Sequence, residues 1–208
     1  MIGAKNLWAV THGRRRRAII WYSCGMQTRT RCLVTLLSVL FLPAMFSPRA
    51  AHAQDIPAGV GEGWLPEFNH ASSQIVALAE ATPAEKFTWR PAPGVRSVSE
   101  VYMHIAIANY YFLSKTGVAA ATEALGKVTP DTEKKVTDKA EVIRWLKNSQ
   151  DLVRENYPKA DLQKKVKFLG KDTTVEAVYL RCLVHSNEHM GQSVAYARMI
   201  GVTPPWSK

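Results

Sequence analysis

The sequence contains little cysteine: three residues among 208, namely Cys24, Cys32 and Cys182. The first two lie in a leader that we expect to be removed, so the remaining chain would hold one thiol and no internal disulfide. A domain of about 150 residues buries roughly two thirds of its unfolded surface, which is enough for a stable core. The scarcity of cysteine therefore excludes a small disulfide-stapled scaffold and leaves packing to stabilise the fold.

Acidic side chains are absent from the first 53 residues, which carry eight basic ones. Of the 27 basic side chains in the whole sequence, 19 thus remain beyond the leader against 17 acidic ones, a net of +2. A phosphate-binding surface needs a basic excess on the folded domain itself. The net charge of +10 belongs largely to the leader, and we expect no nucleic-acid partner.

The main apolar run, residues 32–46, is only 15 residues long and is interrupted by Pro43. A membrane-spanning helix needs about 20 apolar residues, so we expect no permanent membrane anchor. The run follows Arg29 and Arg31 and precedes Ala51-His52-Ala53, an order typical of a cleaved secretory signal peptide.

This order predicts a leader and signal peptide over residues 1–53, with cleavage after Ala53. Met26 would open a signal peptide of ordinary length, so we place the true start near it and assign no function to residues 1–25. The protein is then expected to be exported, either periplasmic or secreted, with its folded domain over residues 54–208.

Strand-period runs of useful length are also missing, and no repeat of 20 to 50 residues is found. Apolar residues at helical spacing instead predict four helices, over residues 64–81, 97–116, 139–157 and 175–200. Residues 86–96 are expected to form an extended connection and residues 166–169 an extended strap. Residues 117–138 fit a short frayed helix or a surface connection, and we treat them as a loop. The predicted fold class is all-α, a four-helix bundle of the up-down type with one long connection.

Two histidines in the last predicted helix, His185 and His189, are spaced four residues apart. Residues at this spacing lie about 6 Å apart on one face of a helix, so both imidazoles can bind one ion. His104 lies on the inward stripe of the 97–116 helix, among Val101, Ala108 and Tyr111. Burying three imidazoles without partners would cost several kcal/mol, and a shared cation removes that cost. The spacing favours a metal site, although a core histidine bonded to a carbonyl is an alternative for His104.

Other residues of the 175–200 helix are candidates for contacts around such a site. Cys182 lies one turn before His185 and either approaches the ion as a thiolate or is a buried structural thiol. Gln192 and Tyr196 either hydrogen-bond a ligand or line the core, and Glu188 is expected in the outer surroundings of the site or at the surface. No catalytic residue is assigned.

The segment His185-Ser-Asn-Glu-His189 also matches the H-x-x-E-H pattern of inverzincin proteases. Those enzymes need a distant acidic ligand downstream, and the 19 residues after His189 include no acidic one. The protease reading is therefore excluded.

Two longer segments, Phe87–Leu113 and His185–Trp206, resemble the DinB-like superfamily of metal-binding four-helix bundles. The resemblance covers nearly all of the chain beyond the leader. Its most specific parts are Trp89-Arg90-Pro91, the Ser97-Val98-Ser99-Glu100 pattern leading to His104, and His185-x-x-x-His189-x-Gly191-Gln192. The resemblance implies that His104, His185 and His189 bind a divalent metal ion, most often nickel or zinc.

Proteins similar to this one include bacillithiol and mycothiol transferases and a thiol-dependent maleylpyruvate isomerase. A metal-dependent hydrolase or a thiol-transferase-like enzyme acting on a small molecule is therefore expected, since three ligands leave a coordination position open. The alternative is a non-catalytic metal-binding or stress-related structural bundle, with Cys182 or Glu188 closing the coordination sphere. Bundles of this kind pair through exposed helix faces, so a homodimer is a further expectation.

Overall fold

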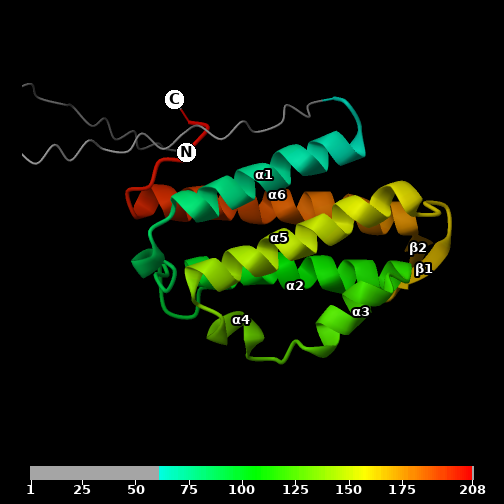
Figure 1. The fold of residues 1–208 in the computed structure, drawn as a ribbon, viewed down its shortest axis with the longest axis horizontal. Helices are drawn as coiled ribbons and strands as arrows, with labels where there is room; N and C mark the ends of the chain where they lie inside the picture. The colour runs from blue at the N-terminus through cyan, green and yellow to red at the C-terminus, as the bar shows by residue number, and fades with distance from the viewer. Residues whose placement is uncertain (1–60, 208) are drawn as a thin grey trace, which may run out of the picture. The chain divides into compact units, whose positions relative to one another are not determined.

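The computed structural model describes residues 61–207, which form six α-helices and one antiparallel β-hairpin (Figure 1). Four of the helices are long, and the other two are short and lie between α2 and α5 in the sequence. The elements are α1 (Trp64–Ala81), α2 (Val98–Thr116), α3 (Ala119–Gly126), α4 (Thr132–Lys135), α5 (Lys139–Asn156), β1 (Lys165–Phe168), β2 (Lys171–Thr174) and α6 (Val175–Met199).

The predicted leader, its signal peptide and the cleavage site after Ala53 lie outside the described residues. Within residues 61–207 no helix is both long and apolar enough to cross a membrane.

Side-chain caps fix where three of the long helices begin. The Ser97 hydroxyl accepts a hydrogen bond from the backbone N–H of Glu100, and the Glu100 carboxylate accepts one from the N–H of Ser97. This reciprocal pair is the predicted capping box, which satisfies two N–H groups that have no partner inside the helix. Asp138 caps α5 and Thr174 caps α6 through a single bond each, in which the side chain accepts from a backbone N–H of the first turn. The predicted starts of these helices are confirmed to within one residue.

Among the four long helices, the main neighbours of both α1 and α2 are α5 and α6. Figure 1 shows the hairpin at one end of the four long helices, with α3 and α4 beside α2. Large apolar side chains from all four fill the space between them and are almost fully buried. They include Phe68, Ile75 and Leu78 of α1, Tyr102, Ile105 and Leu113 of α2, Leu146 and Val153 of α5, and Tyr179 of α6. Each such side chain contributes about 1.5–3 kcal/mol through burial, so this core holds the helices that carry the histidines.

The prediction of a loop over residues 117–138 is wrong, because α3 and α4 lie within it. Ala121 of α3 is completely buried, and Leu125 packs against the same core, so tertiary contacts stabilise a helix of eight residues. Neither helix has a side-chain cap, since Val118 and Asp131 make no capping hydrogen bond. The sequence therefore lacks the start signals by which helices are recognised.

The predicted strap over residues 166–169 is strand β1 of a hairpin, so the fold is mainly helical rather than all-α. β1 pairs with β2 from Lys165 opposite Thr174 to Phe168 opposite Lys171. Leu169 and Gly170 form the turn with φ of 50° and 78°, as a tight two-residue hairpin turn requires. Strands of four residues are too short to show a period of two, and this explains why the sequence did not indicate them.

Candidate metal centre

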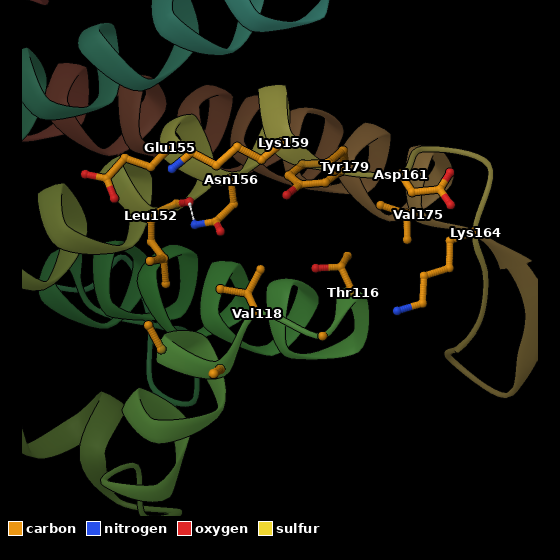
Figure 2. A pocket seen from close by; sticks show the side chains of 14 residues that line it. Thr116, Val118, Leu152, Glu155, Asn156, Lys159, Asp161, Lys164, Val175 and Tyr179 are labelled. Atoms are coloured by element: carbon orange, nitrogen blue, oxygen red, sulfur yellow. Dashed lines mark hydrogen bonds between the residues drawn. The ribbon is translucent and has the colours of Figure 1, made fainter.

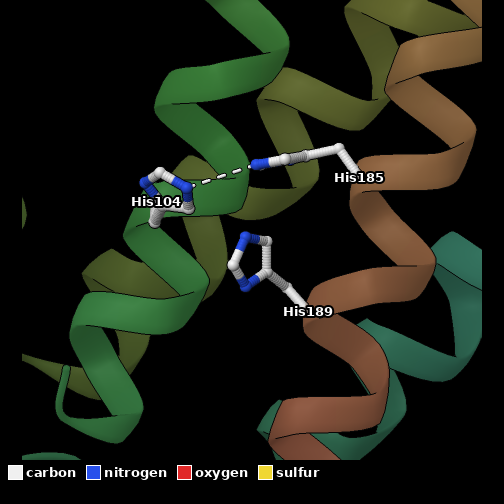
Figure 3. Close-up of side chains that lie close together, drawn as sticks. All are labelled: His104, His185 and His189. Atoms are coloured by element: carbon white, nitrogen blue, oxygen red, sulfur yellow. Dashed lines mark hydrogen bonds between the residues drawn. The ribbon is translucent and has the colours of Figure 1, made fainter. Parts of the chain in front are cut away.

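Three histidine side chains converge between α2 and α6 (Figure 3). His104 comes from α2, and His185 and His189 come from successive turns of α6. Their candidate ligand nitrogens all lie within 4.8 Å of one another. The Nε2 atoms of His104 and His185 are 3.2 Å apart, and His189 lies edge-on to both rings. This geometry could hold one metal ion.

The antiparallel course of α2 and α6 brings these residues to the same level. Phe112, late in α2, contacts His185, whereas His104, eight residues earlier, contacts both His185 and the later His189. The two helices therefore run in opposite directions along their shared face. The capping box fixes the start of α2, and with it the position of His104 in the second helical turn.

Burial keeps the two α6 histidines neutral. His185 is 6% exposed, and its pKa is lowered to about 3, first by burial and then by repulsion from His189, His104 and two arginines. Burial also lowers the pKa of His189, against an opposing hydrogen bond to Gln192. A neutral imidazole is the form that binds metals, so both side chains are in ligand form at neutral pH.

Hydrogen bonds on the outer nitrogens set the tautomers of two of the rings. The Oε1 atom of Gln192 accepts a hydrogen bond from Nδ1 of His189 at 2.8 Å, and Nε2 of Gln192 donates to the Tyr196 hydroxyl at 2.9 Å. His104 donates from Nδ1 to a carboxylate oxygen of Glu133 at 3.2 Å. With the proton on Nδ1, the rings of His104 and His189 each have an Nε2 lone pair that is free to bind an ion.

His185 has no such partner within the described residues: its Nδ1 is buried without a hydrogen bond. Imidazoles buried together without partners for all their nitrogens are costly, and a cation bound between them offsets that cost. A set of three imidazoles whose ligand nitrogens lie within 4.8 Å of one another therefore fits a divalent ion.

Glu133 is the residue of this site that sequence reasoning missed. It lies on α4, where Nε of Arg96 donates to its Oε1 at 2.6 Å while Oε2 accepts from His104. Burial alone would raise the pKa of Glu133, but the bonds from His104 and Arg96 outweigh it and lower the pKa. Glu133 lies 29 residues from His104 in a charged segment without periodicity. No spacing signal could have joined them.

Cys182 and Glu188 do not join the histidines. The Cys182 thiol is completely buried in the core, and burial raises its pKa, so the side chain is a neutral thiol. Glu188 forms an exposed ion pair with Arg181 at 2.8 Å. The group of possible ligands therefore consists of the three histidines.

An open groove of about 640 Å³ lies near the centre, although none of the three histidines lines it. Glu133 and Gln192 both line it, and these are the residues that hydrogen-bond His104 and His189. The groove also exposes Arg90, Arg96 and Lys134. Basic groups therefore lie beside the residues that orient two of the histidines.

A second cavity, of about 560 Å³, lies beside the C-terminal end of α2 (Figure 2). Thr116 lines it, about 18 Å along the α2 axis from His104 at 1.5 Å per residue. Its charged side chains balance, since Lys159 and Lys164 line it together with Glu155 and Asp161. It has no histidine in its lining and is separate from the candidate centre.

Comparison with known proteins finds a sequence profile described as the DinB superfamily, which matches residues 67–193. Among curated proteins, none matches the sequence. Two crystal structures have a similar fold. A DinB-like protein from Bacillus cereus aligns at a TM-score of 0.57 and 20% identity, covering 71% of this chain and 97% of its own. A DinB-like protein from Bacillus subtilis aligns at 0.53 and 20% identity, covering 67% and 93%.

Proposed function

We infer a function from the premise that the chain belongs to the DinB superfamily. We propose that it binds one divalent metal ion, nickel or zinc, through His104, His185 and His189, and that the centre acts on a small molecule. The observation that carries the proposal is the gathering of three imidazoles whose ligand atoms lie within 4.8 Å of one another. The four long helices would then form the bundle that supports it.

The reaction class we favour is metal-dependent hydrolysis. When bound with an open position, the ion lowers the pKa of a water or thiol and so supplies a nucleophile near neutral pH. The chain's own residues keep the ligands in place: Glu133 holds the proton on Nδ1 of His104, and Gln192 accepts the proton on Nδ1 of His189. Arg96 in turn orients Glu133.

Thiol transfer is the second enzymatic candidate, because thiol-dependent transferases occur among similar proteins. The predicted leader favours hydrolysis over it, since low-molecular-weight thiol cofactors are chiefly cytoplasmic and we propose that this chain is exported. The non-catalytic alternative would need a closed coordination sphere. The positions of Cys182 and Glu188, both outside the histidine group, support the open form instead.

The test is the metal content of the full chain as recovered from the expressing cells, measured by elemental analysis after incubation with zinc or nickel. A variant with His104, His185 and His189 all changed to Ala is measured beside it. About one ion per wild-type chain, lost in the variant, supports the proposal. Wild-type protein that takes up neither metal would overturn it.

Changing Glu133 to Gln is expected to weaken zinc binding about tenfold. Glutamine keeps the shape of the side chain but loses the charge that holds the proton on Nδ1 of His104, and it weakens the bond with Arg96. Competition with a chromophoric chelator measures the affinity. Glu123→Gln is the matched control, since Glu123 forms only an exposed pair with Lys127, 3.0 Å away. Equal affinities in the two variants would contradict the role of Glu133.

A further inference from the structure

The groove beside the candidate centre carries an excess of positive charge. Three basic side chains line it, Arg90, Arg96 and Lys134, against two carboxylates, those of Glu100 and Glu133. Both carboxylates are already engaged: Arg90 donates to Glu100 at 2.8 Å, and Arg96 donates to Glu133 at 2.6 Å. The positive charge of Lys134 is therefore not neutralised by a carboxylate of the groove.

Lys134 has no ion pair or side-chain hydrogen bond with any residue between 61 and 207. Its neighbour Lys135 differs, since it pairs with Asp131 at 3.2 Å and does not line the groove. Arg90 and Arg96 each keep about 40% of their side-chain surface exposed, so their remaining N–H groups face solvent in the same groove. Arginine forks and a lysine ammonium together are the groups that recognise carboxylate and phosphate oxygens.

We propose that this groove binds the oxyanion group, carboxylate or phosphate, of a small substrate, with Lys134 supplying the unpaired charge. The inference rests on the proposed function in that the groove would orient a substrate at the metal centre. Two residues that line the groove hydrogen-bond the histidines: Glu133 bonds His104, and Gln192 bonds His189. A molecule held by its anionic end in the groove would thus lie near the residues that orient two of the ligands.

The size of the groove and the charge of the domain indicate a small anion rather than a polyanion. A volume of about 640 Å³ suits a metabolite-sized ligand. Beyond the leader the basic excess is only +2, too small for an extended nucleic-acid surface. The positive charge is confined to the groove, which suits a small anion.

The experiment titrates the full-length, metal-free protein with inorganic phosphate and, separately, with succinate, by calorimetry at low ionic strength. Lys134→Met is compared with Lys135→Met, a matched change on the next residue of the same short helix. We expect Lys134→Met to weaken binding of the preferred anion about three- to fivefold, and Lys135→Met to leave it unchanged. Lys134→Glu is expected to weaken it further. The two anions distinguish a phosphate site from a carboxylate site.

Identical anion affinities in the Lys134→Met and Lys135→Met variants would overturn the proposal. A wild-type protein that binds neither phosphate nor succinate would overturn it as well. Because the titrations use metal-free protein, they do not depend on the metal centre. Zinc binding with no effect of Lys134 would remove the groove proposal alone. An effect of Lys134 in a chain that binds no metal would support the anion site and remove the proposed function.

Discussion

Zinc affinity is expected to fall more than about 100-fold when His185 is changed to Ala. His185 is the most buried of the three histidines, and its Nε2 lies 3.2 Å from that of His104. Its removal leaves His104 and His189 as two ligands on different helices. Zinc prefers four ligands, and with two imidazoles instead of three the protein supplies only half of them, so the affinity falls. Competition against a chelator of known affinity measures the loss.

The matched control is His70→Ala, on α1 and outside the histidine group. It is expected to bind zinc as the wild type does. The metal-free His185→Ala protein should still fold, because the change also removes a buried nitrogen that has no hydrogen-bond partner in the described residues. A folded His185→Ala variant with wild-type zinc affinity would show that His185 is no ligand.

The stability of the metal-free protein is expected to decrease as the pH falls below about 6.5. The pKa of His185 is lowered from 6.5 to about 3 by folding, so the unfolded chain takes up a proton in this range and the folded chain does not. The free energy of unfolding then decreases by up to about 1.4 kcal/mol per pH unit for this residue alone. His189, with its lowered pKa, acts in the same direction. Above pH 6.5 both states are neutral, and this contribution to stability is fully present.

Urea unfolding between about pH 7.5 and 5 measures this dependence, and it stays above the range in which most carboxylates titrate. His185→Gln replaces the imidazole with a side chain that does not titrate, so its stability should depend less steeply on pH. If the variant keeps the wild-type slope, the pH dependence comes from other groups.

Local signals were sufficient to predict the long helices. The range of α1 was predicted to the residue, and α6 ends one residue before the predicted 175–200 range. Ser97 and Thr174 mark helix starts because each satisfies a backbone N–H close to it in the sequence. Such bonds span only a few residues, so the sequence alone indicates where these helices begin.

The residues of the site likewise divide into those with a local sequence signal and those without one. The pair His185 and His189 follows from a spacing of four on one helix, and His104 follows from its place on an inward stripe. Glu133 could not be predicted, because its bonds to His104 and Arg96 join segments 29 and 37 residues apart. The helix that carries Glu133 has four residues and no side-chain cap, and packing rather than local propensity fixes its position.

The separation of the histidines along the chain has a consequence for a domain whose described residues, 61–207, contain one cysteine. His104 and His185 are 81 residues apart, so a bound ion would join α2 to α6 as a cross-link. A permanent link closing a loop of that length removes conformational entropy from the unfolded chain equivalent to about 4.5 kcal/mol. The centre would thus stand in for the disulfide that the folded domain cannot form.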